Sequence, residues 1–455
     1  MARAGAAHGE IQMTEGSLWK NILLFSIPLV FSQLLQVMFN MADVAVVGKF
    51  ASDTALGSVG STSTLVTLFT GFLIGMGNGV NVRVAQHLGA QHREETSRAV
   101  HTAFLLCLLA GLGIMALCLA LAANMLEMLH TKDDLLPGAV LYFRIYALGM
   151  PALGIFNFGN AVLSANGDTK RPLLYLTIAG ILNVILNLFF VIVCKMAADG
   201  VALASVISQY VSAILVVWHM MRLNDACKFY FQRLRFHGDE VGRILGLGVP
   251  AGIQHMIFAI ANLFIQAAVN SFDSTMVSGN AAAANTDTII YNIMMAFYTA
   301  CSTFMGQNWG AGHKKRMMDS YLISLFYAFA VAAVLGVAFY FAGRPFLYVF
   351  TNSADVVEAG MQRMKIMCFS YAISAFMDNT IAACRGLGRT IVPTVVVIMG
   401  SCVFRVIWVY TIFAHYHTIP SLYLLYAFSW TITAAAEIVY FLHCFRKLRL
   451  VPETA

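Results

Sequence analysis

Long apolar runs recur along the whole chain, and they limit the possible folds more than any other feature. Each run is close to the roughly 20 residues that an α-helix needs to cross a bilayer. Only 11% of the residues are charged, against about 25% in a typical soluble domain. A transmembrane β-barrel would instead show alternating segments of about ten residues. The sequence therefore predicts an all-α polytopic membrane protein with the lipid bilayer as its surroundings.

Twelve spans are expected from these runs, and the basic residues orient them. Of the 28 Lys and Arg residues, the termini and one alternate set of loops hold 20, the other set holds 7, and Arg405 lies inside a span. Basic residues are retained on the cytoplasmic side, so both termini should be cytoplasmic. The net charge of +6 then reflects topology, and we expect no nucleic-acid partner. The predicted spans are 20–46, 57–84, 99–123, 137–163, 172–194, 200–222, 244–271, 279–305, 319–342, 360–384, 391–413 and 420–444.

Short motifs recur at a near-constant separation and divide the chain into two halves. Pro28 recurs as Pro250, and "AQHLGAQHR" (Ala85–Arg93) recurs as "GQNWGAGHK" (Gly306–Lys314). "GDTKRP" (Gly167–Pro172) likewise recurs as "GRTIVP" (Gly388–Pro393). Six spans in each repeat make the two halves parallel and pseudo-symmetric. We expect a cytoplasmic N-terminal segment 1–19, a six-helix bundle 20–222, a basic cytoplasmic linker 223–243, a second six-helix bundle 244–445 and a cytoplasmic tail 446–455.

The first span carries a polar stripe. Gln36, Asn40 and Asp43 are spaced i, i+4 and i+7, which places them on one face of a helix. An ionisable residue inside the membrane is costly, and its default interpretation is functional. Pro28 lies earlier in the same span and should kink the helix. Asp43 is therefore the first candidate for an ion site.

Polar side chains on other spans of the first half could join Asp43. Asn183 and Asn187 share a face of the fifth span, and Ser205 lies in the sixth. Such groups also form ordinary bonds between helices, so a structural role is the alternative. Burial disfavours the charged form of a carboxyl group, which lets it exchange a proton, and oxygen ligands also suit a sodium ion. The sequence does not choose between the two ions. Cavity candidates are Gln36, Met38, Phe39, Tyr142, Asn157 and Asn160.

The second half repeats the shape but not the charge. The counterpart of Asp43 in the second repeat is Ile265. This asymmetry points to an ion site in the first half only. Polar candidates in the second half are His255, Asn262 and Gln266 on the seventh span, the candidate pair Asp378 and Arg405, and the acids Asp287 and Glu437.

Four stretches together resemble the multidrug and toxic compound extrusion (MATE) transporters, and most closely the DinF-like prokaryotic branch. They are "IPLVFSQLLQVMFNMADVAVVGKF", "AQHLGAQHREE", "SANGDTKRPLL" and the motif Gln307–Ala311. The resemblance implies a V-shaped pair of bundles that exports small organic cations or drugs in exchange for H⁺ or Na⁺. It further implies a prokaryotic plasma membrane (inner membrane) location, and no cofactor other than the coupling ion. We expect a monomer.

The resemblance also assigns roles to residues. It implies coupling at Asp43 with Asn183 and Ser205, and a hinge at Pro28. Asn40 and Asn187 join the predicted ion-coupling set through their helical spacing from Asp43 and Asn183. Sodium would bind at Asp43, Asn183 and Asn187. The chain departs from the family at Asn187, where some members have a second aspartate. It also lacks the seventh-span glutamate of the NorM-like branch and offers only Gln254 and His255 there.

Two other functions compete with the exporter. A lipid-linked precursor flippase of the same superfamily should line its cavity with several buried basic residues, whereas only Arg405 lies deep in a span. An integral-membrane enzyme needs a nucleophile or metal motif, and the chain contains no HExxH and no P-loop. We therefore expect a transporter and not an enzyme.

Overall fold

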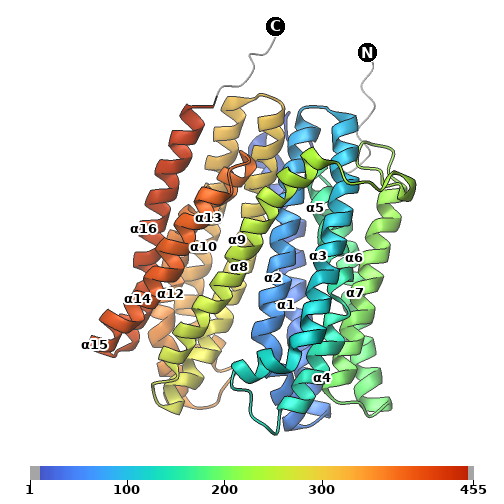
Figure 1. Ribbon diagram of the computed structural model, residues 1–455. Helices are drawn as coiled ribbons and strands as arrows, with labels where there is room; N and C mark the ends of the chain where they lie inside the picture. Colours follow the sequence, from blue (N-terminus) through green and yellow to red (C-terminus); the bar gives the residue numbers. More distant parts are fainter. Residues whose placement is uncertain (1–10, 449–455) are drawn as a thin grey trace. The chain divides into compact units, whose positions relative to one another are not determined.

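The computed structural model describes residues 11–448, and all of their regular elements are helices (Figure 1). Eleven helices are long and apolar enough to cross a membrane, or twelve if one bent pair counts as a single span. The predicted all-α polytopic fold is thus confirmed. Residues 1–10 of the predicted N-terminal segment and 449–455 of the predicted tail lie outside the described residues.

The chain forms two compact units. Unit 1 contains Phe31–Met256 with the described residues 11–12, and unit 2 contains Met13–Val30 and the chain from Ile257 onward. The boundaries fall inside α1 (Leu18–Phe50) and α8 (Gly238–Val269), so each of these helices contributes to both units. The two units group residues by their contacts, whereas the predicted bundles divide the chain by position along the sequence. The predicted bundle boundaries therefore remain predictions.

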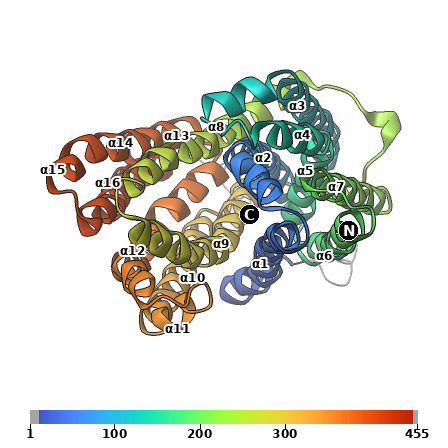
Figure 2. The same ribbon diagram turned by 90° about the horizontal axis from the view of Figure 1, so that it is seen from below.

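Unit 1 is built around α5, which packs against α2, α3 and α7 (Figure 2). The fourth predicted span is bent by 44° between α4 and α5, at Gly149. The fifth span ends as a π-helix, η1. The elements are α2 (Asp53–Gly89), α3 (Arg93–Met128), α4 (Leu136–Ala147), α5 (Met150–Ala165), α6 (Lys170–Leu188), η1 (Phe189–Val193) and α7 (Ala198–Met221), followed by the short η2 (Phe231–Arg233).

Unit 2 is built around α12, which packs against α9, α10 and α16. Its eleventh span alternates between α-helical and π-helical segments. The elements are α9 (Ser274–Gly310), α10 (Lys314–Phe341), α11 (Gly343–Leu347), α12 (Ala354–Gly386), α13 (Ile391–Val397), η3 (Ile398–Val403), α14 (Phe404–Trp408), η4 (Val409–Phe413), α15 (Ala414–Tyr416) and α16 (Ile419–Arg446).

The two halves begin their helices in the same way, as the repeat predicts. Ser52 caps α2 by accepting a hydrogen bond from the Ala55 amide at 3.1 Å. Asp273, at the equivalent place in the second half, caps α9 by accepting one from the Met276 amide at 2.8 Å. Ser and Asp at this position satisfy an amide that the helix leaves free. Both helices extend beyond the predicted spans because their polar ends remain helical up to these caps.

Glycines let α2 and α8 cross closely inside unit 1. Gly75 and Gly79 on α2 face Gly248 and Gly252 on α8, and a Cβ added to Gly79 would lie 2.5 Å from the Gly248 nitrogen. Small residues four apart permit this backbone approach in membrane helices, where packing rather than the hydrophobic effect drives association.

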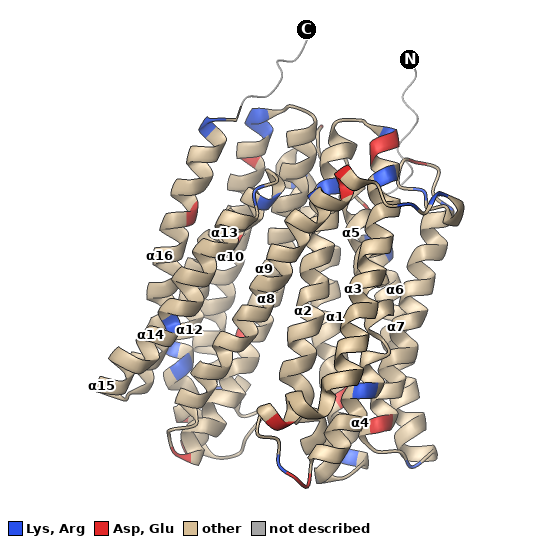
Figure 3. Cartoon of the chain, viewed as in Figure 1, with Lys and Arg blue, Asp and Glu red and all other residues tan. Residues whose placement is uncertain are grey.

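Charged side chains gather at the helix ends, and the long middle sections are largely apolar (Figure 3). This distribution is what a bilayer requires, because a charged side chain in hydrocarbon is costly unless it has a partner. The few charged residues in the middle sections are therefore the strongest candidates for function.

Candidate functional site

Asp43 lies in the part of α1 that belongs to unit 1, and its carboxylate receives two hydrogen bonds. The Asn187 side-chain amide donates to Oδ1 at 2.5 Å. The Ser205 hydroxyl donates to Oδ2 at 3.5 Å. Among the described residues, no Lys or Arg forms an ion pair with Asp43. The carboxylate is thus held by neutral donors alone.

The same donors are linked to each other across α6 and α7. The Asn183 amide donates to the Ser205 hydroxyl at 3.3 Å, and the Asn187 amide also donates to the Asn183 carbonyl at 3.2 Å. Asn187 is fully buried, and its own carbonyl oxygen has no partner among the described residues. Four of the five predicted ion-site residues therefore form one connected cluster, which we call the Asp43 cluster: Asp43, Asn183, Asn187 and Ser205.

Apolar and aromatic side chains of one buried group lie near the Asp43 cluster. Val46, Val47 and Val201 belong to a buried apolar group next to it. Tyr142 and Tyr146 on α4 stack at 6.0 Å between ring centroids, and both interact electrostatically with the Asp43 carboxylate. Tyr142 was predicted from the sequence but Tyr146 was not, although the i, i+4 spacing in α4 puts both on one face.

The groups of the Asp43 cluster could bind either a proton or a sodium ion. Two donors facing a carboxylate stabilise its ionised form, and a proton arriving at Asp43 would replace one of them. A sodium ion would need oxygens, and the unpartnered Asn187 carbonyl becomes such a ligand when the amide turns over. The orientation of an amide is assigned from its hydrogen bonds, so either rotamer is chemically accessible. The residues present therefore suit either ion.

The other residues predicted for the first half lie apart from the Asp43 cluster. Gln36, Met38 and Asn40 are exposed on α1. Phe39 lies over Gly180 of α6, where a Cβ would collide with its ring. On α5, Asn157 donates to its own helix at the Leu153 carbonyl, 2.9 Å away, and Asn160 accepts a long 3.5 Å bond from Ser164. Pro28 lies inside α1, in the segment that belongs to unit 2.

Three predicted polar residues of the second half do not converge. His255 lies in the part of α8 that belongs to unit 1 and packs against Gly71 of α2. Asn262 and Gln266 are exposed, and the Gln266 amide donates to the Asn270 side chain at 2.9 Å.

The acids of unit 2 have different environments. Asp287 forms an ion pair with Arg363, whose guanidinium also donates to the Tyr423 hydroxyl at 3.0 Å. Asp378 interacts electrostatically with Arg385 and Arg405. Among the described residues, however, no ion pair joins Asp378 to Arg405. Glu437 is fully buried and interacts electrostatically with Arg385. The pairing of Asp287 with Arg363 was not predicted, because the two residues lie 76 positions apart.

A second buried ionic group lies in unit 1 and was also missed. Arg83 on α2 donates to both carboxylate oxygens of Glu240 on α8, at 2.7 Å each. His87 lies 3.0 Å from the same carboxylate. The sequence suggests only a cytoplasmic-side location for these residues, and nothing local connects Arg83 to Glu240 over 157 positions.

Comparisons with known proteins support one family. The MatE family profile matches residues 28–189 and again residues 250–411. The Bacillus subtilis "Probable multidrug resistance protein YpnP" is 29% identical over 358 residues, which are 79% of this chain and 80% of that protein. The Shewanella oneidensis "FAD transporter" is 23% identical over 346 residues, 74% of this chain and 75% of that one.

The fold matches solved structures over nearly its full length. A MOP superfamily transporter from Pyrococcus furiosus superimposes with a TM-score of 0.90, covering 97% of this chain and 99% of that chain at 19% identity. The profile matches well over half of the sequence, in two copies of equal length that correspond to the predicted repeat. The chain therefore belongs to the MatE family of multidrug and toxic compound extrusion transporters, and it is a multi-pass membrane transporter and not an enzyme.

Proposed function

We propose that the protein is a secondary active multidrug exporter that exchanges organic cations for H⁺ or Na⁺ at the Asp43 cluster. The observation that carries this proposal is the Asp43 carboxylate, which lies inside a membrane span and is held by neutral donors and by no basic residue among those described. An unpaired intramembrane acid is expensive to keep and marks ion pathways. The relatives are named for different substrates, from multidrug resistance to FAD. The proposal that this chain exports cations therefore rests on the Asp43 carboxylate, which has no ion-pair partner among the described residues.

The proposed cycle uses the charge of Asp43 as its switch. With Asp43 ionised, a cationic and partly apolar substrate is bound. An ion from outside then neutralises the carboxylate, displaces the Asn187 and Ser205 donors, and lets α1 rearrange around Pro28. The substrate leaves outward by alternating access. Coupling requires that the ion binds the two conformations with different affinity.

Membrane location and orientation complete the proposal. A prokaryotic plasma membrane with both termini cytoplasmic agrees with the uneven distribution of Lys and Arg over alternate loops. The protein acts as a monomer, and within the family it belongs to the DinF-like branch with its coupling site in the N-terminal bundle.

The test is gradient-driven efflux of ethidium from proteoliposomes. Wild type, Asp43→Asn and the control Glu358→Gln are compared under a pH gradient alone and then a sodium gradient alone. Glu358 is an exposed acid paired with Arg344 at 2.8 Å, so its loss removes one carboxylate without touching the Asp43 cluster. We expect one gradient to drive wild type and the control but not Asp43→Asn, which also names the ion.

Two outcomes would refute the proposal. Gradient-driven efflux by Asp43→Asn at the wild-type rate would make Asp43 a structural residue. Wild type that moves no cation under either gradient would rule out the exporter and favour the lipid-linked precursor flippase.

A further inference from the structure

The second notable charge inside a span has the opposite sign. Arg405 lies on α14 and is only 3% exposed. Its Nε donates to the Ser429 hydroxyl at 3.3 Å, but its Nη2 has no hydrogen-bond partner among the described residues. No carboxylate within residues 11–448 forms an ion pair with it. Burying a guanidinium that has no ion-pair partner costs several kcal/mol of stability. Arg405 is therefore a candidate for a functional role.

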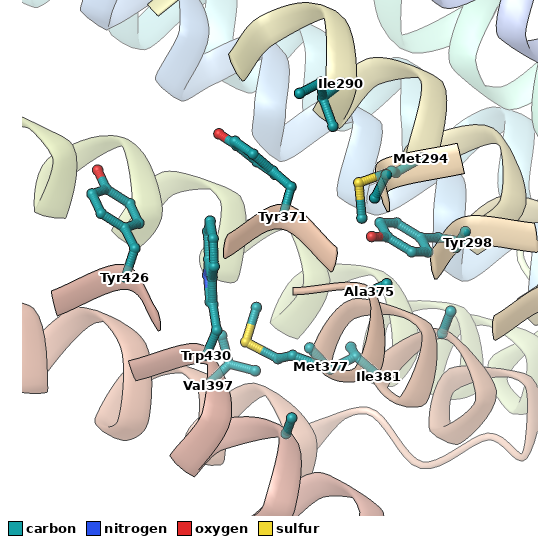
Figure 4. Close-up of a cluster of buried hydrophobic side chains, with 14 of the residues drawn as sticks. Ile290, Met294, Tyr298, Tyr371, Ala375, Met377, Ile381, Val397, Tyr426 and Trp430 are labelled. Carbon is teal, nitrogen blue, oxygen red and sulfur yellow. The ribbon is translucent and has the colours of Figure 1, made fainter. Parts of the chain in front are cut away.

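Aromatic rings surround the guanidinium. Its central carbon lies 4.3 Å from the ring centroid of Tyr426 and 5.6 Å from those of Phe258 and Trp430. Trp430 stands between Tyr426 and Tyr371, with each pair of ring centroids 5.2 Å apart (Figure 4). Cation–π contacts offset part of the burial cost, but they do not satisfy an N–H donor. The site thus offers a planar hydrogen-bond donor beside aromatic rings that are tilted against one another.

The internal repeat places this group where unit 1 has its ion site. The two matches to the family profile begin at residues 28 and 250, and the same displacement carries Asn183 to Arg405. A displacement one position shorter carries Ser205 to Tyr426. Asp43 itself is replaced by the buried Ile265. The amide and hydroxyl partners of Asp43 in one half therefore correspond to a cationic and an aromatic residue in the other.

The backbone around Arg405 is also unusual. The five residues of α14 lie between the π-helical segments η3 and η4. In unit 1 the π-helix η1 begins two residues after Asn187. π-Helical turns are rare and occur frequently at functional sites. In both halves such a turn therefore adjoins a buried polar residue, Asn187 in one and Arg405 in the other.

We propose that unit 2 binds an aromatic carboxylate at Arg405, with the carboxylate on Nη2 and the aromatic body among Tyr371, Tyr426 and Trp430. Arginine pairs with carboxylates through a planar fork and also stacks on rings, which explains why both features occur together. The inference rests on the exporter proposal only in treating the ligand as cargo, and it adds an anionic or zwitterionic aromatic class to the cations expected from Asp43. Binding itself does not depend on transport.

The test measures binding to the purified full chain in detergent by equilibrium dialysis. Two probes share one ring system and differ in charge, 2-naphthoate and 2-naphthylmethylammonium. We expect saturable binding of naphthoate about tenfold or more tighter than that of the amine, since a charge-assisted hydrogen bond is worth about one decade in affinity. Arg405→Gln should lose this preference, and Arg405→Lys should retain part of it. Trp430→Leu should weaken naphthoate binding while leaving the order of the two probes unchanged.

Controls keep the result specific. Arg344→Gln removes one positive charge from the surface, where the side chain is 63% exposed, and should bind naphthoate as wild type does. Inorganic phosphate should compete poorly, and a phosphate that displaces naphthoate at equal concentration would show that a headgroup alone is recognised and would overturn the aromatic class. Equal binding of the two naphthyl probes by wild type would overturn the proposal without any variant. Failure of ethidium efflux under both gradients would refute the exporter but not this binding site.

Discussion

Replacing Glu240 by glutamine should destabilise the protein by about 3–5 kcal/mol, the cost of breaking one side of a buried ion pair. The geometry of the Arg83–Glu240 pair supports a cost of this size. Arg83 donates to Glu240 through two 2.7 Å bonds, and the side chains of Arg83 and Glu240 are 8% and 7% exposed. Glutamine keeps the size of the side chain but removes its charge, so the Arg83 guanidinium stays buried without a counter-ion.

An exposed pair supplies the scale for comparison. Arg98 and Glu94 lie one helical turn apart on α3 at 2.5 Å, with side chains that are 51% and 74% exposed. Surface pairs of this kind contribute about 0.3–0.5 kcal/mol. Glu94→Gln should therefore cost about a tenth of what Glu240→Gln costs, although the two bonds have similar lengths. Burial, and not bond length, decides the difference.

The assay is unfolding in mixed micelles of increasing SDS fraction, followed by far-ultraviolet circular dichroism. Alongside the two single variants, the double variant Arg83→Met/Glu240→Leu tests the reasoning. Replacing both members of a buried pair by apolar side chains is often neutral or stabilising. We expect it to unfold close to wild type. A Glu240→Gln variant as stable as Glu94→Gln, or a double variant less stable than Glu240→Gln, would refute the argument from burial.

Other variants test the helix crossing and the Asp43 cluster. Gly79→Ala should destabilise the α2–α8 crossing by about 1–3 kcal/mol through overpacking, because the added Cβ would lie 2.5 Å from the Gly248 nitrogen. Gly113→Ala on α3 is its matched control, since a Cβ there meets nothing within 4 Å. This control should stabilise the protein by up to about 1 kcal/mol from helix propensity alone. The same SDS assay compares the two variants, and equal effects on stability would contradict the close crossing. Asn187→Ala should slow ethidium efflux about tenfold or more, as expected for a hydrogen bond to a charged group, whereas Ser205→Ala should slow it less because its bond to Asp43 is 3.5 Å and not 2.5 Å. The reverse order of the two rates would show that these contacts do not set the coupling.

The spans, the repeat and the clustering of four polar side chains could all be predicted from sequence. Hydrophobic length identifies a membrane helix, and helical spacing tells which residues share a face. Asp43 on α1 and the Asn183 and Asn187 pair on α6 each had a defined face. A lone acid in hydrocarbon needs partners, and the polar groups of the same half were the candidates. These candidates also included Asn40, Asn157 and Asn160, which do not join the cluster.

The pairing between distant helices could not be predicted in this way. Periodicity gives the face of a helix but not the neighbour that the face meets or the height at which they meet. Arg83 and Glu240 resemble ordinary residues of the basic loops, and Asp287 and Arg363 lie on spans that no local signal connects. The π-helical turns beside Asn187 and Arg405 could not be predicted either, because a widened turn does not change the pattern of an apolar run in the sequence. These features depend on tertiary packing, which overrides local preference.

The division of α1 between two units has a consequence for how the chain is made. Residues Met13–Val30 leave the ribosome before the rest of unit 2, which holds their partners: the Met13 carbonyl accepts from Arg316, 303 positions later, and Phe25 meets Phe304 edge-on at 5.5 Å. At about 5–20 residues per second, that partner is synthesised about 15–60 s afterwards. The first half of α1 must therefore wait in the membrane with its packing face unfilled, and insertion factors or lipid have to cover it. Truncated chains that end before α9 should be the form that cellular quality control removes fastest.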